Sequence, residues 1–403
     1  MTATPILPGA TIGFLGGGQL GRMTAFAARS MGYDVHVLDP DAQCAMAPVS
    51  SRVITAPFTD VNAAVDLASQ CDVVTLEIEQ IHPDVLDAVA ARTLLRPGRA
   101  PVYIIQDRLR QKEWLASNSF PHGAFRGANS STDIAAAVAD FGASIAKSCH
   151  GGYDGRGQVR LSDAALAGKT WDELGGRECL VEKQLDLAYE ISVLVARSAS
   201  GAIAAYPPSR NHHTRGILTW AVIPADIPPA MSDAATALAS AIAERIGIVG
   251  LLAVECFVTT DARLLVNELA PRPHNTYHHS ERACVTGQFE QLVRAVCDLP
   301  LGDTAVIESG AIVNLLGDVW LHANAPDMCA ALDVPTSRLH LYGKASARAG
   351  RKMGHLSALG DTSQEALGRV LSAYRHMSAD TSDSFDVHEP DLRDAVRTAL
   401  ASA

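Results

Sequence analysis

The amino-acid sequence predicts a mixed α/β and α+β fold in which a parallel-sheet domain precedes a larger α+β domain and a small C-terminal domain. A chain of 403 residues that is 48% hydrophobic is too long for one ordinary core. Its start reads strand, glycine turn, helix, strand, as in a βαβ unit. After about residue 120, short strands alternate with few helices, which is typical of α+β folds. We expect a Rossmann-like domain over 1–105, an α+β domain over 106–305 and a small domain over 306–403.

The first domain is predicted from residues 11–39 and the segment that follows them. TIGFLG is apolar, QLGRMTAFAARSMG has helical spacing that ends at Gly32, and YDVHVLD is rich in strand formers. A further αβ unit is expected in VNAAVDLASQCDVVTLEIE. The segment RPGRAP then interrupts the pattern, and the first domain is expected to end just beyond it.

The second domain is predicted to start with a helix from Gln106 to about Asn118. Short strands follow in ASIAKS, GQVRL, ECLVEKQ, ISVLVARS and AIAAYP. The helix DAATALASAIAERIG, a hairpin around Asp261 and a helix near FEQLVRAVC complete this domain. The last domain opens with the strand AIVNLLG and closes with the helix SQEALGRVLSAYRHM.

Composition and charge exclude several classes of protein. A formal net charge of −11 argues against a broad nucleic-acid surface, which needs clustered lysine and arginine. The N-terminus lacks the features of a signal peptide, and no apolar run reaches the ~18 residues that span a bilayer. We therefore expect a cytoplasmic protein without membrane contact. The eight cysteines form no C-x-x-C pair and predict reduced core residues rather than a zinc site or disulfides.

The segment GFLGGGQLGRM places Gly16, Gly18 and Gly21 in a G-x-G-x-x-G pattern between a strand and a helix. Asp39 ends the following strand, as a dinucleotide site requires. Glycines at a helix N-terminus let backbone N–H groups approach any phosphate, however. Three interpretations stay open from this segment alone: a nicotinamide or flavin site, a site for another phosphate ligand, and a structural tight turn.

A hairpin in LLAVECFVTTDARLLVNELAPRPHN carries two carboxylates. A two-residue loop at Asp261 and Ala262 would place Glu255 directly opposite Glu268, with Cβ atoms ~5 Å apart. A divalent cation would relieve their repulsion, and magnesium suits carboxylates that share it with nucleotide phosphates. The alternative is a hairpin whose acids face water. Further groups at the same end of the sheet are Asn267, Arg272, His274 and Asn275.

A second glycine-rich segment, SIAKSCHGGYDGRGQVRL, has Lys147 at the end of a strand and four glycines before the next. Such a loop is typical of a flap that closes over phosphates, and the alternative is a surface loop without a ligand. Beyond it, Glu182 and Glu190 stand at opposite ends of a short connection. A carboxylate there suits ribose hydroxyls, while backbone groups near Glu182 suit an adenine edge.

Several of these motifs together resemble a known family. AKSCHGGYDGRGQ, VEKQLDLAYEIS, LLVNELAPRPHN and LYGKASARAGRKMGH are similar to segments of the ATP-grasp superfamily, and closely to its 5-(carboxyamino)imidazole ribonucleotide synthases of purine biosynthesis. GFLGGGQLGRM and QDRLRQK match the opening of the same family, so the resemblance covers nearly the whole chain. It implies an ATP-grasp fold whose Rossmann-like N-terminal domain, the pre-ATP-grasp domain, binds the ribonucleotide and not NAD.

The resemblance implies a ligase reaction. ATP phosphorylates bicarbonate to carboxyphosphate, and the amine of 5-aminoimidazole ribonucleotide takes up the carboxyl group, directly or through released carbon dioxide, giving the carbamate, ADP and phosphate. The implied cofactors are ATP and two Mg²⁺ ions, and the family also implies a homodimer.

The resemblance also implies site residues. Magnesium would be held by Glu255 and Glu268. ATP would contact Arg108, Lys147, Glu182, Glu190, His213 and Asn267. Bicarbonate and carboxyphosphate would be surrounded by Arg272, His274 and Asn275. The ribonucleotide would contact Gly18, Gln19, Leu20, Glu77, Tyr153, Asp154, Arg156, Lys344, Arg351 and Lys352.

The sequence departs from the family pattern at four places. Tyr277 replaces a usual glycine, Arg215 a usual acid, His150 lies in a usually basic stretch, and Ser346 stands where an acid is common. These departures leave a second hypothesis open, a related ATP-grasp ligase that couples an activated carboxylate to a different amine. An NAD-dependent oxidoreductase and a nucleotide-binding regulator without turnover are more remote alternatives.

Overall fold

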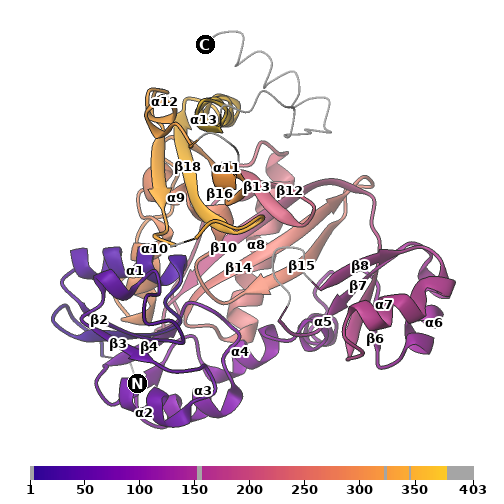
Figure 1. Cartoon of the computed structure of the whole chain (residues 1–403), viewed down its shortest axis with the longest axis horizontal. Coiled ribbons are helices and arrows are strands. Elements are labelled where there is room, and N and C mark those ends of the chain that lie inside the picture. Colours follow the sequence, from indigo (N-terminus) through magenta and orange to yellow (C-terminus); the bar gives the residue numbers. More distant parts are fainter. Residues whose placement is uncertain (1–3, 152–156, 322–324, 345, 379–403) are drawn as a thin grey trace.

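The structure, a computed structural model, describes residues 4–151, 157–321, 325–344 and 346–378. Figure 1 shows three lobes around a long twisted sheet. The N-terminal lobe lies at the lower left, a small lobe with its own sheet at the right, and the C-terminal strands at the top. The predicted mixture of a parallel-sheet α/β domain with α+β parts is confirmed.

The N-terminal lobe is a parallel sheet in the order β3-β2-β1-β4-β5. Its strands are β1 (Thr11–Leu15), β2 (Asp34–Asp39), β3 (Arg52–Thr55), β4 (Val73–Leu76) and β5 (Leu94–Leu95). Its helical segments are α1 (Gln19–Ser30), η1 (Ala47–Val49), α2 (Val61–Ala68) and α3 (Pro83–Ala90). The predicted βαβ unit is therefore present, and Gly32 follows α1 with a positive φ of 87° that favours glycine. Each strand of the first βαβ unit ends at the same edge, where the glycine turn lies.

Two helices connect this lobe to the rest. The prediction of one helix from Gln106 was incomplete, because α4 (Arg99–Ile105) forms directly after Pro97 and Gly98, ahead of α5 (Arg108–Ser117). Asp107 caps α5 by accepting a hydrogen bond from the N–H of Arg110. This cap separates the two helices and sets Arg108 and Lys112 on the first turns of α5.

The small lobe holds an antiparallel sheet in the order β6-β9-β7-β8. Its elements are β6 (Phe125–Ala128), α6 (Ser131–Phe141), β7 (Ser144–Ser148), β8 (Gln158–Leu161), η2 (Ala164–Leu166), α7 (Ala167–Glu173) and β9 (Cys179–Lys183). Its buried side chains, among them Ile134, Ala146 and Val181, form a core of their own under α6 and α7. Lys147 and Glu182 therefore sit on a compact unit that faces the large sheet (Figure 1).

The large sheet runs in the order β15-β14-β10-β12-β13-β16-β18-β17, and β11 pairs with β10. Its strands are β10 (Leu187–Arg197), β11 (Ile203–Ala205), β12 (Ser209–Thr214), β13 (Ile217–Ile223), β14 (Gly250–Thr259), β15 (Leu264–Ala270), β16 (Ser309–Leu316), β17 (Arg338–Leu341) and β18 (Lys352–Gly360). Its helical segments are α8 (Pro229–Ile246), η3 (Asn275–Tyr277), α9 (Ser280–Ala283), α10 (Gln288–Val296), α11 (Asp318–Leu321), α12 (Met328–Leu332) and α13 (Ser363–Ser378). Because β16 pairs with β13, one sheet continues from the middle of the chain into its C-terminal part.

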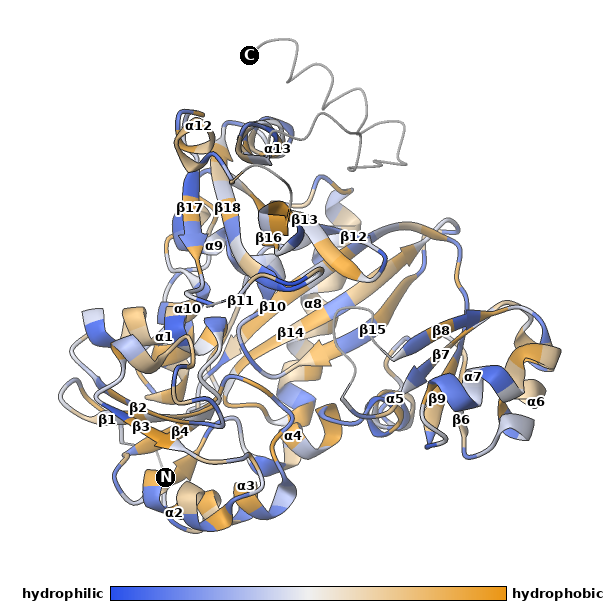
Figure 2. Cartoon of the chain, in the orientation of Figure 1, coloured by the Kyte–Doolittle hydropathy of each residue, from blue (hydrophilic) through white to orange (hydrophobic). Residues whose placement is uncertain are grey.

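Apolar side chains are concentrated in the central strands β10 and β14 (Figure 2). One core cluster joins N-terminal residues such as Phe14 and Val35 to Leu251, Tyr277 and Leu292, so the first lobe packs directly on the large sheet. Within the described residues, no helix has the length and apolar character needed to cross a membrane. The cysteines are free thiols and all but Cys329 are buried, as predicted.

Candidate functional site

The two carboxylates predicted to face each other do so. Glu255 on β14 and Glu268 on β15 are register partners. Burial, together with the neighbouring Glu268 and Glu190, raises the pKa of Glu255 to about 7 against the opposing effect of His213. Two carboxylates held together in a partly buried site form an oxygen-rich position that favours a cation.

The route to this register differs from the prediction. The hairpin loop has three residues, because the N–H of Thr259 donates to the carbonyl of Arg263. A register shift between Glu255 and Cys256 then restores the opposition of the two acids. Such a bulge also breaks the alternation of side chains, so the consecutive residues Asn267 and Glu268 line the same cavity. Asn267 Oδ1 is buried and has no hydrogen-bond partner among the described residues, which leaves it free for a ligand.

Glu182 lies between two lysines where the small lobe meets the large sheet. Its Oε1 is 2.9 Å from Lys112 Nζ, and its Oε2 is 2.5 Å from Lys147 Nζ. Burial opposes ionisation, but the two ammonium groups outweigh it and lower the pKa of Glu182 to about 2. The cavity beside these groups measures about 10 Å³, which is room for about one water. A nucleotide therefore requires the lysine side chains to move apart.

Of the further predicted ATP residues, one lines this cavity and two lie on the large sheet. Arg108 lines the cavity and donates from Nη1 to the carbonyl of Ser148, 2.8 Å away. On the large sheet, Glu190 Oε2 is 2.7 Å from His213 Nδ1. Burial lowers the pKa of His213, but the Glu190 carboxylate outweighs burial and raises it. The predicted ATP residues thus occupy facing surfaces of the small lobe, α5 and the large sheet.

The loop after β15 carries Arg272, His274 and Asn275 close to the paired acids. His274 Nε2 is 3.2 Å from Glu255 Oε1, and His274 Nδ1 is 2.9 Å from Thr276 Oγ1. Burial, aided by nearby Arg272, holds the pKa of His274 well below its usual value, so its imidazole is neutral at neutral pH. Both amide atoms of Asn275 are buried without a partner among the described residues. This loop therefore presents an uncharged ring and a free amide.

Arg272 is held by a partner that sequence reasoning did not identify. Its Nε and Nη2 donate to the two carboxylate oxygens of Glu79, at 2.6 and 3.1 Å. Glu79 follows β4, so this bidentate pair joins the N-terminal lobe to the large sheet. The signal was present, because Glu77 and Glu79 both stand directly after a buried strand.

The glycine turn differs from a dinucleotide site. The N–H groups of Gly18 and Leu20, at the start of α1, donate to the Glu77 carboxylate. Asp39 accepts a hydrogen bond from the N–H of Gly17 at 2.8 Å, so it fastens the turn. Burial raises the pKa of Glu77 to about 7, although Arg272 lowers it. An internal carboxylate at this helix N-terminus takes the place of a pyrophosphate and would repel one.

The predicted C-terminal cations lie on the loop between β17 and β18 and at the first residue of β18. Lys344 Nζ donates to the carbonyl of Lys352 at 2.7 Å. Arg351 Nη1 donates to the carbonyl of Ser346 at 2.8 Å and lies 3.2 Å from its hydroxyl. Lys352 is near enough to His274 to lower the pKa of that histidine, so its loop adjoins the carboxylate site. Tyr153, Asp154 and Arg156 lie outside the described residues.

Of the four departures from the family pattern, one lies in the core, one is exposed, and two make polar contacts with nearby residues. Tyr277 is fully buried, and its hydroxyl lies 2.8 and 2.9 Å from the carbonyls of Ser192 and Pro207. Its ring thus packs in the core rather than in the site. Arg215 is exposed at the β12–β13 turn with a positive φ of 52°. His150 pairs with Asp107 at 3.2 Å, and Ser346 contacts Arg351 as described.

Two residues of the site were missed although their motif, QDRLRQK, was recognised. Lys112 is the second cation beside Glu182 and also donates to the carbonyl of Val266 at 3.1 Å. Gln111 accepts from the N–H of Leu269 at 3.0 Å and donates to its carbonyl at 3.3 Å. Helical spacing would assign these two positions equally well to a core-facing or to a solvent-facing side. Periodicity therefore did not identify either residue as part of the site.

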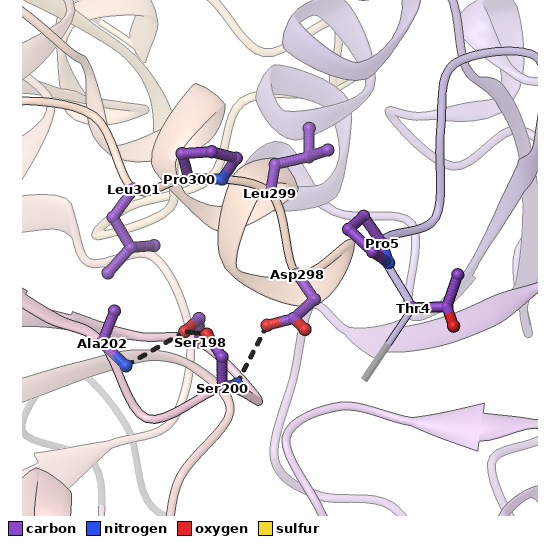
Figure 3. Close-up of a pocket in the computed structure, with 9 residues that line it drawn as sticks. All are labelled: Thr4, Pro5, Ser198, Ser200, Ala202, Asp298, Leu299, Pro300 and Leu301. Atoms are coloured by element: carbon purple, nitrogen blue, oxygen red, sulfur yellow. Dashed lines mark hydrogen bonds between the residues drawn. The ribbon is translucent and has the colours of Figure 1, made fainter. Parts of the chain in front are cut away.

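Two other features lie apart from this site. Figure 3 shows a pocket of about 490 Å³ lined by Thr4, Pro5, Ser198, Ser200, Ala202, Asp298, Leu299, Pro300 and Leu301. None of the predicted site residues that the structure describes lines it. Elsewhere Glu281, His340 and His355 lie near enough to share an ion. The two imidazole planes are only 8° apart in a stack, however, so their in-plane lone pairs do not converge on one metal.

Comparisons with known proteins agree with this geometry. Residues 9–106 match the ribonucleotide synthetase preATP-grasp domain, residues 113–289 the ATP-grasp domain, and residues 310–369 the phosphoribosylaminoimidazole carboxylase C-terminal domain. The chain is 36% identical over 376 residues to the N5-carboxyaminoimidazole ribonucleotide synthase of Bacillus subtilis (strain 168), covering 93% of this chain and 98% of the relative.

Solved structures give the same result. A structure of an N5-carboxyaminoimidazole ribonucleotide synthetase with ADP matches with a TM-score of 0.86 and 38% identity, covering 93% of this chain and 99% of the other. The Aspergillus clavatus N5-carboxyaminoimidazole synthase with ADP and 5-aminoimidazole ribonucleotide matches with a TM-score of 0.82 and 28% identity, covering 91% and 98%. The resemblance inferred from the motifs is confirmed: the chain belongs to the N5-carboxyaminoimidazole ribonucleotide synthase family of ATP-grasp ligases.

Proposed function

We propose that this protein carboxylates 5-aminoimidazole ribonucleotide with bicarbonate at the expense of ATP. Carboxyphosphate is the intermediate, and the products are 5-(carboxyamino)imidazole ribonucleotide, ADP and phosphate, as in purine biosynthesis. The observation that carries the proposal is the convergence of the paired acids Glu255 and Glu268 with the Arg272–Asn275 loop, on a chain that matches this family along nearly its full length.

ATP is proposed to lie between the small lobe and the large sheet. Lys147 leaves its ion pair with Glu182 and contacts the phosphates. Glu190 binds the ribose, and His213 orients Glu190 through their 2.7 Å contact. Arg108 and Asn267 complete the nucleotide contacts. The proposed metal ligands Glu255 and Glu268, with the unpaired Asn267 Oδ1 beside them, form the hard oxygen set that Mg²⁺ prefers. When bound, magnesium neutralises charge on the phosphates, and two ions are expected.

The Arg272–Asn275 loop is proposed to hold bicarbonate and then carboxyphosphate. Arg272 supplies positive charge, and Glu79 fixes the direction of its side chain. The unpaired amide of Asn275 offers a donor and an acceptor to the intermediate. His274 is proposed to accept the proton of the attacking amine. That role needs a neutral ring, which burial beside Arg272 maintains.

The ribonucleotide is proposed to bind at the edge where the glycine turn meets the C-terminal loop. Gly18, Gln19 and Leu20 offer close backbone approach, and Glu77 offers a carboxylate for hydroxyl or amine groups. Lys344, Arg351 and Lys352 supply cations for the phosphate, and Tyr153, Asp154 and Arg156 are proposed to complete the contact. The buried position of Tyr277 supports this acceptor over a different amine, because the largest departure from the family pattern leaves the site's surface unchanged.

The deciding measurement is ADP release with Mg-ATP and bicarbonate, with and without 5-aminoimidazole ribonucleotide. Strong stimulation by the ribonucleotide, with formation of the carboxylated product, is expected. Slow ADP release that the ribonucleotide leaves unchanged would instead indicate another acceptor. We also propose a homodimer in the cytoplasm, which sedimentation and cell fractionation test.

A further inference from the structure

Gln288, the first residue of α10, holds the backbone of His274. Its side chain is fully buried. Oε1 accepts the N–H of His274 at 2.8 Å, and Nε2 donates to the carbonyl of His274 at 3.0 Å. If the amide were reversed, its NH₂ group would face the N–H of His274 and its oxygen would face the carbonyl of His274. Neither pair could form a hydrogen bond, so the orientation of the Gln288 amide is fixed. Gln288 therefore holds the N–H of His274, and it shares the His274 carbonyl with the N–H of Tyr277, which donates at 3.0 Å.

The ring of His274 has contacts of its own, with Glu255 at 3.2 Å and Thr276 at 2.9 Å. His274 precedes η3 in an extended conformation, outside the ladder of β15. Gln288 is itself anchored, because its N–H donates to Ser280 Oγ at 3.0 Å and Ser280 Oγ donates to the carbonyl of Tyr277 at 2.6 Å. The second amide hydrogen of Gln288 faces His278 Nδ1 at 3.1 Å. Hydrogen bonds from the start of α10 thus hold the loop at several points.

We propose that Gln288 is a positioning residue for the carboxylation reaction. It fixes the backbone of His274, and so the neighbouring Asn275, at the place where carboxyphosphate waits for the amine. This inference rests on the proposed function. Without the clamp, carboxyphosphate leaves the site before the amine attacks and its C–O(P) bond breaks. That bond's electrons stay on the phosphate oxygen, the carboxyl proton passes to phosphate, and carbon dioxide is released.

The same helix offers a matched control. Gln291 is also fully buried, and it holds Gly302 in the same way. Its Oε1 accepts the N–H of Gly302 at 2.8 Å, and its Nε2 donates to the carbonyl of Gly302 at 2.9 Å. Gly302 belongs to no proposed site. Replacing either glutamine by methionine removes the same pair of hydrogen bonds at similar side-chain length.

The test compares wild type, Gln288→Met and Gln291→Met. ADP is measured by a coupled assay, and carboxylated ribonucleotide by NMR with ¹³C-bicarbonate. We expect about one ADP per product in wild type and Gln291→Met. We expect at least about tenfold more ADP than product in Gln288→Met, because small displacements of reacting groups are costly. The KM for ATP should stay within about twofold in both variants, since Gln288 touches no proposed ATP residue.

Either of two outcomes overturns the proposal: a wild-type ratio of ADP to product in folded Gln288→Met, or equal losses of ADP and product. If Gln288→Met does not fold, Gln288→Glu replaces it. That variant keeps the acceptor for the His274 N–H but sets a carboxylate oxygen against the His274 carbonyl, and it should show the same excess of ADP. A wild-type enzyme that forms no carboxylated ribonucleotide would refute the proposed function as well. If wild type forms the product but the Gln288 variants show no excess of ADP, only the role of Gln288 is refuted.

Discussion

Glu182 depends on two lysines, and its removal should be costly. Its carboxylate contacts Lys112 and Lys147, which are themselves almost completely buried. Glu182→Gln leaves two buried ammonium groups without their counter-ion. We expect a loss of about 3–5 kcal/mol in the free energy of unfolding, measured by urea titration at pH 7. The matched control is Glu173→Gln, which removes an exposed ion pair of 3.6 Å to Lys169 and should cost less than about 1 kcal/mol.

The same carboxylate predicts a pH dependence. The pKa of Glu182 falls from 4.5 to about 2 on folding, chiefly because the lysines outweigh burial. A depressed pKa contributes stability that is complete above pH 4.5 and is lost as the pH falls toward 2. The gap in unfolding free energy between wild type and Glu182→Gln should therefore narrow below pH 4.5. A gap that stays constant over that range would contradict this assignment.

Tyr277 should matter for folding rather than for substrate choice. Tyr277→Phe removes a hydroxyl that serves two buried carbonyls, and we expect a loss of about 1–3 kcal/mol in unfolding free energy. Tyr277→Gly restores the family's usual residue but empties a buried ring site, and it should cost at least about 3–5 kcal/mol. The phenylalanine variant should keep the kcat/KM for 5-aminoimidazole ribonucleotide within about twofold. A tenfold fall would mean that the hydroxyl acts in the site.

At the scale of elements, the β14–β15 hairpin shows which structural features the sequence predicts and which it does not. The apolar segments identified both strands, and an assumed two-residue loop predicted the pairing of Glu255 with Glu268, which the structure confirms. The loop length was wrong, and the bulge near Asn267 compensates for it. Periodicity cannot separate a two-residue loop from a three-residue loop followed by a bulge, because both bring the same residues together. The bulge is what turns Asn267 toward the site.

The glycine turn was predicted as an element, but the contact of its N–H groups with the Glu77 carboxylate was not predicted. Gly18 has an ordinary φ of −73°, so its small size rather than its conformation is what the turn requires. A Cβ at Gly18 would clash with the Glu77 carboxylate, which lies far away in sequence and cannot be placed by local patterns. Gly18→Ala should therefore displace Glu77, lower the unfolding free energy by about 1–3 kcal/mol and raise the KM for the ribonucleotide.

The control for Gly18→Ala is Gly168→Ala. Gly168 lies in α7, and a Cβ there would meet nothing within 4 Å. Alanine in this exposed helix should add about 0.5–1 kcal/mol to the unfolding free energy and leave the KM unchanged. Urea titration and steady-state kinetics measure both quantities. If Gly18→Ala behaves as Gly168→Ala does, Glu77 does not require the glycine.

At the scale of the whole molecule, the sequence predicted helices and strands but not the contacts that join distant parts of the chain. The contacts that join distant parts of the chain include Glu79 with Arg272 and Glu182 with Lys112. The pairing of β16 with β13 also carries one sheet past residue 305, so the division at that residue stays a prediction about sequence units. Such long-range pairings depend on the packed core, which one sequence does not encode in any local pattern.

The small lobe should respond to nucleotide as a unit. Its apolar core is its own, and its contacts with α5 include two polar ones, Lys112 with Glu182 and Arg108 with Ser148. The proposed ATP residues Lys147 and Glu182 lie on this lobe, and Glu190 and Asn267 lie on the large sheet. Bound nucleotide would therefore link the two, and any opening would first have to release it.

Hydrogen exchange followed by mass spectrometry measures this effect. At about 100 times its Kd, Mg-ADP should slow exchange of β7 and β9 amides by up to about 100-fold. Exchange in α13 should not change, because α13 packs in a separate C-terminal core with β18. Glu268→Gln, which removes a proposed metal ligand, should weaken the protection of β7 and β9 at the same nucleotide concentration. Equal protection of β7, β9 and α13 would mean that nucleotide stabilises the whole fold, and the small lobe would then not open as a separate unit.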